Sequence, residues 1–297
     1  MADSTTTRSP SLADWLGGAR PRTWPNAFAP VIIGSGAAAD ANGFVAWKAV
    51  AAATVALALI IGVNYANDYS DGIRGTDDDR SGPLRLTGSR LARPEHVRTA
   101  AFAAFGVAGA CGLALAATSA WWLVLLGALC IAAAWFYTGG SRPYGYRGLG
   151  EVAVFVFFGL VAVLGTQFTQ SGHITWVGFA GAVAVGCFSA AVNLVNNLRD
   201  IPTDEASGKI TLAVRLGERH TRTLWVVLAA VPYLMTLILS TGHPPALAAL
   251  IALPVSLAAA KPVIRGETGA ELIPVLGATG KTMLMWSAVT AVALGFG

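Results

Sequence analysis

Residues 45–72 read VAWKAVAAATVALALIIGVNYANDYSDG, an apolar run that ends in a cluster of amide and carboxylate side chains. As an α-helix, the apolar part at 45–66 is long enough to cross the ~30 Å hydrocarbon core of a bilayer. The polar end, from Asn64 to Asp71, then leaves the membrane at one face. This combination predicts a membrane-spanning helix that carries reactive groups at its end.

The same kind of apolar run recurs along the chain. Of the 297 residues, 55% are hydrophobic and only 12% are charged, with a mean hydropathy of +0.60. Soluble globular chains carry about 25% charged residues. The runs are continuous rather than alternating, which disfavours a β-barrel, and they are rich in the small residues that let helices pack closely in lipid. Nine runs are found, at 25–39, 45–66, 99–118, 120–138, 151–170, 174–196, 223–241, 244–260 and 282–297.

These runs predict an all-α membrane protein, a bundle of nine transmembrane helices. We expect residues 1–297 to form a single integral membrane domain, with a polar N-terminal tail at 1–20. Residues 266–280, which precede the last run, are expected to lie along the membrane interface.

The distribution of charge predicts the orientation. Of the 20 basic residues, only Lys48 falls on the side of the odd-numbered connections, and Asp40 is the only acid there. The positive-inside rule therefore places the N-terminus and the two long polar connections in the cytoplasm, with the C-terminus outside the cell membrane.

Other kinds of site find little support. The three cysteines lack metal or redox spacing, and the four histidines make no HExxH pair. The net charge of +4 is spread along one membrane face, as topology alone requires, so we expect no nucleic-acid partner.

Two motifs stand out at the ends of equivalent runs. In the first, Asn67 and Asp71 are four residues apart and share a helix face, and Asn64 and Asp68 share a neighbouring face. The second motif follows the sixth run.

In the second motif, Asn196, Asp200 and Asp204 also repeat at intervals of four. Pro202 lies inside this repeat and is expected to break or kink a continuous helix. The shared face is therefore less secure here than in the first motif.

Both motifs offer oxygen ligands, which suit a hard cation such as Mg²⁺. Substrate phosphates usually complete the shell of Mg²⁺, so two facing acid clusters predict a site for a metal-bound diphosphate. Arg74, Arg80, Arg142, Lys209 and Arg215 are placed to stabilise charge on a leaving diphosphate. Simple solvated loops would explain residues 77–79, but not the paired spacing in the two motifs.

With these motifs, the chain resembles the UbiA superfamily of intramembrane aromatic prenyltransferases over essentially its whole length. The resemblance is greatest to the branch that prenylates 1,4-dihydroxy-2-naphthoate. The stretches that carry it are 67–72, 74–77, 82–85, 196–200 with Asp204, and 208–217.

The resemblance implies a UbiA-like bundle of nine helices with a lateral opening to lipid. It implies Mg²⁺ held through Asn67, Asp71, Asp200 and Asp204, with Asp68 assisting, so that the four aspartates are the expected catalytic residues. One departure is visible: many members carry a third acid at the position of Gly75, and the role of the nearest acid, Asp77, is left in doubt.

The residues expected to contact the substrates form two sets, one for the diphosphate and one for the aromatic acceptor. Three of these residues could instead have purely structural roles. Arg22 can be an ordinary basic flank of the first helix, Tyr137 an interfacial anchor, and Glu151 a cap of the next helix. The diphosphate is expected to contact Arg22, Arg74, Arg142, Lys209 and Arg215. The aromatic acceptor is expected to contact Asn64, Tyr137, Glu151, Asn196 and Asn197.

The implied reaction transfers a polyprenyl chain from polyprenyl diphosphate to 1,4-dihydroxy-2-naphthoate, with loss of CO₂ and diphosphate, giving a demethylmenaquinol. Another acceptor, 4-hydroxybenzoate or homogentisate, is the main alternative. Residues 68–72 resemble the opening of a CDP-alcohol phosphotransferase motif, but Gly75 and Thr76 replace its next residues. A transporter would carry its acids mid-helix rather than at helix ends.

Overall fold

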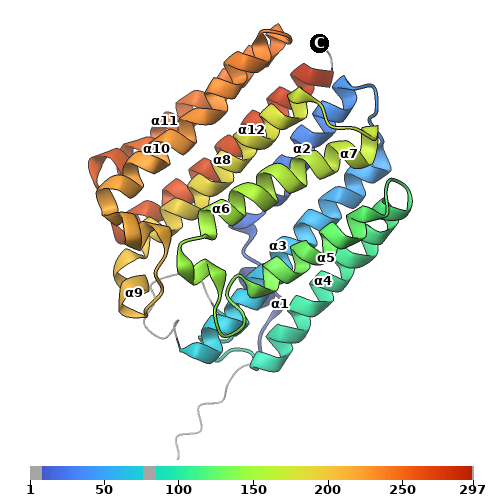
Figure 1. Ribbon diagram of the computed structural model, residues 1–297. Coiled ribbons are helices and arrows are strands. Elements are labelled where there is room, and N and C mark those ends of the chain that lie inside the picture. Colours follow the sequence, from blue (N-terminus) through green and yellow to red (C-terminus); the bar gives the residue numbers. More distant parts are fainter. Residues whose placement is uncertain (1–8, 76–84, 296–297) are drawn as a thin grey trace, which may run out of the picture.

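The computed structural model describes residues 9–75 and 85–295, and every regular element within these ranges is a helix. The long helices run side by side as one bundle (Figure 1). This confirms the all-α fold class. Asp77, Arg80 and residues 82–84 of the sequence motifs lie outside the described residues.

Seven helices are long and apolar enough to cross a membrane. They are α3 (Ala46–Arg74), α4 (Pro94–Ala117), the continuous α6–η3–α7 (Gly150–Ser171), α8 (Trp176–Arg199), α10 (Leu212–Ser240), η4–α11 (Pro244–Arg265) and η5–α12 (Gly269–Gly295).

By this measure the predicted count of nine spanning helices is too high. Two of the nine runs form shorter helices, α2 (Pro25–Asp40) with 16 residues and α5 (Trp122–Phe136) with 15. At 1.5 Å per residue each is about 23 Å long, below the ~30 Å of a bilayer core. Both are helical where the sequence predicted them, but of the two only α5 has the apolar character of the seven longer helices.

Helix α8 lies at the centre of the bundle. It packs against α10, α12, α2 and the π-helical stretch η3 (Phe155–Leu164), and most of its length is buried. The surrounding helices instead expose large apolar side chains, such as Trp121, Leu125 and Ile251. Exposed apolar surface of this extent on long helices is what a lipid environment requires. The chain is therefore an integral membrane protein.

Small residues allow the closest helix contacts, as the composition predicted. A Cβ atom added to Gly159 would lie 2.6 Å from the Cα of Gly186 on α8. A Cβ on Gly36 of α2 would lie 2.6 Å from the Cα of Ala291 on α12. At these crossings a hydrogen in place of a side chain lets two backbones touch.

The two sequence motifs lie at the same end of the bundle, at the lower left of Figure 1. The first motif is part of α3, which ends at Arg74 and is capped by Gly75 in the left-handed conformation (φ 73°) that favours glycine. In the second, α8 ends at Arg199 and the short helix α9 (Ile201–Ala206) begins with Pro202 in its first turn. The predicted break at Pro202 is confirmed.

The prediction that residues 266–280 lie along the membrane interface is wrong for residues 273–280. Helix α12 (Ile273–Gly295) already begins at Ile273, after a single short 3₁₀ turn at Gly269–Leu272. Val275, Thr279 and Gly280 are buried in the bundle. Because these residues face neighbouring helices rather than lipid, their modest hydropathy is compatible with a place inside the bundle.

Candidate active site

Asp68 and Asp71 of α3 are both buried, and their carboxylates have different partners. Asp68 accepts hydrogen bonds from two backbone N–H groups, those of Leu86 at 2.7 Å and Thr87 at 2.9 Å. Asp71 accepts one from the Tyr146 hydroxyl at 2.7 Å, and Arg85 lies 3.6 Å from its other oxygen. Asp68 therefore holds the segment that carries Arg85, whereas Asp71 is surrounded by side chains.

The second motif places two more carboxylates in buried positions. Arg199 pairs with both oxygens of Asp200, its neighbour, at 2.7 Å each. Asp204, on α9, accepts from Lys209 at 3.2 Å. The backbone N–H of Asp204 also bonds the Asp200 carbonyl at 2.8 Å, so the turn at Pro202 keeps the two acids close in the chain.

The connection between α5 and α6 (Gly150–Val154) joins the two motifs. The Thr138 hydroxyl donates to the Asn67 amide oxygen at 2.7 Å, and the Arg74 guanidinium donates to the carbonyls of Thr138 and Gly140. Further along, the 3₁₀ turn η2 (Tyr144–Arg147) carries Tyr146 to Asp71.

The basic residues predicted to contact a diphosphate fall into two groups. Arg74 and Lys209 lie in this cluster, each 5.6 Å from the centre of the Tyr146 ring. The exposed Arg215 packs its guanidinium beside Gly148, where an added Cβ would be 3.1 Å from its Nε. Arg22 and Arg142 are exposed, as Arg74 is, but among the described residues no contact joins either of them to this cluster.

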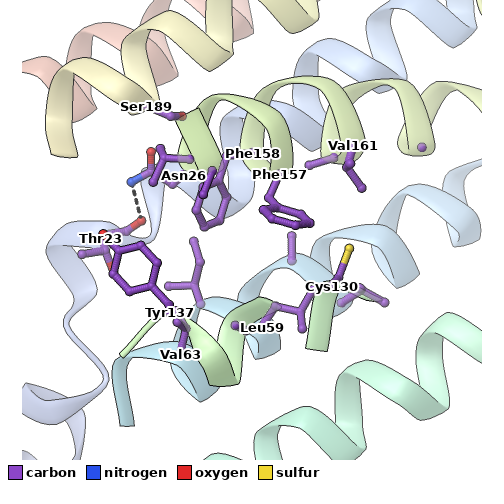
Figure 2. Close-up of a pocket in the computed structure, with 18 of the residues that line it drawn as sticks. Thr23, Asn26, Leu59, Val63, Cys130, Tyr137, Phe157, Phe158, Val161 and Ser189 are labelled. Carbon is purple, nitrogen blue, oxygen red and sulfur yellow. Dashed lines mark hydrogen bonds between the residues drawn. The ribbon is translucent and has the colours of Figure 1, made fainter. Parts of the chain in front are cut away.

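A cavity of about 360 Å³ extends from the motifs into the bundle. Its long apolar part is lined from α3, α5 and η3, with Phe157, Phe158, Leu59 and Cys130 among the lining side chains (Figure 2). The polar part of its lining near the motif end includes Arg20, Asn64, Asn67, Tyr137, Asn193 and Asn196, and Thr166 and Thr169 line it toward the opposite end. Such a cavity can take a molecule with a long apolar part and a polar head.

Arg22 of the N-terminal segment was predicted as a diphosphate contact, but Arg20, two residues earlier, is the arginine that lies in the cavity wall. Arg20 sits in the left-handed conformation (φ 51°) just before the 3₁₀ turn η1 (Pro21–Thr23). The sequence offered two arginines flanking a proline, and only the backbone turn decides which one faces inward.

The predicted acceptor residues Asn64, Tyr137 and Asn196 line the cavity, and Glu151 and Asn197 lie just behind it. Asn64 is held by the Ala19 carbonyl and the Thr23 hydroxyl, at 3.1 and 3.0 Å. Its amide therefore ties the N-terminal segment to α3.

Glu151 sits at the base of this region, 4% exposed. Its Oε1 accepts from Asn193 at 3.1 Å and from Asn197 at 2.7 Å. Its Oε2 is buried and has no hydrogen-bond partner among the described residues. Asn193 itself lines the cavity, so it connects the carboxylate of Glu151 to the space where a ligand would lie.

Tyr144 closes the cavity from the η2 turn. Its hydroxyl donates to the Ala133 carbonyl at 2.8 Å, and its ring meets Tyr137 edge to face at 5.4 Å. Burial raises the pKa of Tyr144 to about 12, so the hydroxyl stays a neutral donor at physiological pH. Tyr144 and Tyr146 were not predicted as site residues, because only the folded connection brings them to the motifs. Asn193 was not predicted either, although it lies on α8 three residues before Asn196.

The oxygen ligands that the two motifs offer are of the kind that binds Mg²⁺. Asp71, Asp200 and Asp204 are 5%, 4% and 3% exposed, and together with the Asn67 amide they supply the hard oxygen ligands that Mg²⁺ prefers. Within the part of the chain described, no three His, Cys, Asp or Glu side chains come close enough together to hold a metal by themselves. Ligands from phosphate and water would therefore have to complete the shell, which is usual for Mg²⁺.

An apolar cavity in a membrane bundle, with Asn67 and Asn196 of the two carboxylate-bearing motifs in its wall, is suited to an intramembrane enzyme that acts on a lipid-like diphosphate. The sequence of the UbiA prenyltransferase family matches residues 27–294, and this chain belongs to that family. It is a prenyltransferase, as the sequence motifs predicted.

Relatives of this chain include the 1,4-dihydroxy-2-naphthoate octaprenyltransferase of Mycobacterium tuberculosis. The two sequences are 59% identical over 287 residues, which cover 97% of this chain and 98% of the relative.

Solved structures share the fold. A UbiA homolog from Aeropyrum pernix K1, in its apo form, aligns with a TM-score of 0.71 at 16% identity, over 91% of this chain and 97% of that one. A UbiA homolog from Archaeoglobus fulgidus bound to DMAPP and Mg²⁺ aligns with a TM-score of 0.67 at 14% identity, over 95% and 99%.

Proposed function

We propose that this protein transfers a polyprenyl chain from polyprenyl diphosphate to 1,4-dihydroxy-2-naphthoate, with release of CO₂ and diphosphate, to give a demethylmenaquinol. The observation that carries the proposal is the apolar cavity whose wall includes Asn67 and Asn196, one residue from each of the two motifs that carry the buried carboxylates. The name of the mycobacterial relative, at 59% identity over nearly the whole chain, supports the acceptor.

The donor fits with its polyprenyl chain in the apolar part of the cavity and its diphosphate at the motif end. Arg74 and Lys209 are the cations we assign to the diphosphate, with Arg20 in the nearby cavity wall. Mg²⁺, held through oxygen atoms of Asn67, Asp71, Asp200 and Asp204, would supply further positive charge to the leaving group.

In the reaction, the allylic C–O bond of the donor breaks and its electron pair leaves with the diphosphate. The apolar wall around Phe157 and Phe158 keeps water away from the allylic carbon. A ring carbon of the acceptor forms the new C–C bond, and the acceptor carboxylate leaves as CO₂. Tyr137, Asn193 and Asn196 line the region where the acceptor ring would lie.

We further propose that the protein acts in the cell membrane with the motif end in the cytoplasm, where a charged acceptor is available. The excess of basic residues at this end supports that orientation.

The test is an assay in membranes that contain the protein, with labelled polyprenyl diphosphate and a panel of acceptors. We expect Mg²⁺-dependent transfer to dihydroxynaphthoate and a product mass that shows the loss of CO₂. Product formed from 4-hydroxybenzoate or homogentisate, but not from dihydroxynaphthoate, would refute the acceptor.

The motif residues are tested with Asp71→Asn, which keeps the shape of the side chain. We expect kcat/KM to fall by about 10²–10³-fold, as when a charge-stabilising group is removed from an active site. Asp40→Asn is a matched control, because Asp40 pairs with His243 at 2.7 Å at the other end of the bundle. Full activity of Asp71→Asn would refute the role of the first motif.

A further inference from the structure

Tyr146 touches charged groups of both motifs. It sits on the η2 turn, far in sequence from either motif, and its hydroxyl donates to Asp71 Oδ1 at 2.7 Å. The guanidinium carbon of Arg74 and the ammonium nitrogen of Lys209 each lie 5.6 Å from the centre of its ring. One side chain thus contacts an acid and a base of the first motif and a base of the second.

Each of the two cations is also held by a second contact. Arg74 donates to the carbonyls of Thr138 and Gly140, on the same connection as Tyr146. Lys209 bonds Asp204 Oδ1 at 3.2 Å. The ring therefore contacts two cations, one bonded to the α5–α6 connection and the other paired with Asp204 of α9.

This arrangement has a physical use. Two like charges repel each other, and the electron-rich face of an aromatic ring attracts both. The ring can therefore hold two cations near one point before any anion arrives. A diphosphate that bound there would meet cations already in position, which reduces the reorganisation needed during bond cleavage.

We propose that Tyr146 is a positioning residue for the diphosphate site, with two separable parts. Its ring sets the spacing of Arg74 and Lys209, and its hydroxyl orients the carboxylate of Asp71. The identity of the anion as the diphosphate of a prenyl donor rests on the proposed function. Tyr146 acts through these three side chains.

The test compares Tyr146→Phe, which keeps the ring, with Tyr146→Leu, which removes both parts. For Tyr146→Phe we expect a donor KM within about twofold of wild type and a several-fold higher Mg²⁺ concentration for half-maximal activity. For Tyr146→Leu we expect the donor KM to rise about tenfold as well, with the acceptor KM unchanged.

Tyr69→Phe and Tyr69→Leu are the matched controls. Tyr69 lies at the same end of the bundle, with Arg98 5.9 Å from its ring centre, but it stacks on Trp135 at 6.1 Å and does not line the cavity. We expect donor KM and Mg²⁺ dependence to match wild type in both. A rise in donor KM for Tyr69→Leu equal to that for Tyr146→Leu would overturn the proposal.

A double-mutant cycle separates positioning from general structure. If the ring acts through Lys209, Lys209→Gln combined with Tyr146→Leu will raise the donor KM by much less than the product of the single effects. Effects that simply multiply would overturn the proposal.

A binding measurement keeps this result independent of the reaction. In purified protein, Mg²⁺ with inorganic diphosphate should raise the thermal unfolding temperature, and Tyr146→Leu should reduce that rise while Tyr69→Leu keeps it. An equal rise in wild type and Tyr146→Leu would overturn the proposal. A wild type that shows the Tyr146-dependent rise but transfers no prenyl chain would refute only the proposed function.

Discussion

Asp68 and Asp71 lie one turn apart on α3, but their carboxylates have different hydrogen-bond partners in the structure. The sequence motif placed both among the catalytic aspartates. In the structure both oxygens of Asp68 are bonded to backbone N–H groups of Leu86 and Thr87. A carboxylate that anchors two amides in a buried position is best suited to hold a segment in place.

We therefore expect Asp68→Asn to act mainly on stability. The amide can accept at one position but turns an N–H₂ group toward the other backbone donor, so a buried N–H loses its partner. The loss should lower the free energy of unfolding by about 1–3 kcal/mol. Thermal unfolding in detergent measures it, and activity should fall less than in Asp71→Asn. Unchanged stability together with a loss of activity as large as that of Asp71→Asn would instead support a catalytic role.

Glu151 offers a second residue-scale prediction. Its Oε1 accepts from Asn193 and Asn197, and a glutamine oxygen can keep both bonds. Glu151→Gln should therefore fold normally, and its effect will report the charge of the buried carboxylate. We expect kcat/KM for the acceptor to fall about tenfold, while the KM for polyprenyl diphosphate stays the same.

Steady-state kinetics with each substrate varied in turn is the measurement. Asn64 lines the same cavity but bonds only neutral groups of the N-terminal segment in the contacts described. A change confined to the donor KM in Glu151→Gln would place Glu151 on the diphosphate side and contradict its assignment to the acceptor.

The site residues that could be predicted from the sequence depend on local patterns, whereas those that could not be predicted depend on long-range contacts. Asn67, Asp71, Asp200 and Asp204 could be found because helical spacing and chemical type are properties of a short stretch. Tyr146 could not, because its meaning arises only when an irregular connection folds back onto two helix ends. No local pattern of charge or periodicity specifies that approach.

At the scale of elements, the predicted helices were recovered wherever the apolar runs were long and continuous. The break at Pro202 was predictable because proline lacks the N–H that a helix interior needs. The early start of α12 was not. Val275, Thr279 and Gly280 face other helices and not lipid, and hydropathy alone cannot show which face of a helix is buried.

The contact of the π-helical stretch η3 with α8 makes a prediction at this scale. A methyl group on Gly159 would lie 2.6 Å from the Gly186 Cα and 2.7 Å from the Ala182 carbonyl oxygen. Since these are backbone atoms, they cannot move aside without shifting a helix. Gly159→Ala should therefore lower the free energy of unfolding by about 1–3 kcal/mol.

Thermal unfolding of purified protein checks this, with Gly109→Ala as control. A Cβ on Gly109, in the outer helix α4, meets nothing within 4 Å. There alanine should be neutral or stabilising by up to ~1 kcal/mol, because it favours the helix more than glycine does. Equal unfolding temperatures for the two variants would show that η3 and α8 can separate freely.

At the scale of the whole molecule, the motif end and the opposite end differ in how they use charge. At the opposite end, Lys48 donates to the Thr118 carbonyl, the Ser119 hydroxyl and the Thr169 carbonyl at 3.0, 2.9 and 2.7 Å. Asp40 pairs there with His243. The few charged side chains of this end are thus taken up by contacts within the protein, while most arginines lie at the motif end.

This asymmetry predicts the orientation of the chain. The bundle places α1 (Leu12–Gly18) at the motif end and the end of α12 at the other (Figure 1). Because basic residues are retained in the cytoplasm, we expect the N-terminus inside and the C-terminus outside. In a bacterial host, alkaline phosphatase fused after Gly297 should be active, since it needs an oxidising compartment. Green fluorescent protein should fluoresce when fused at the N-terminus. An inactive phosphatase together with a fluorescent C-terminal fusion would place both ends of the chain in the cytoplasm, and it would require an even number of crossings in place of the odd number expected here.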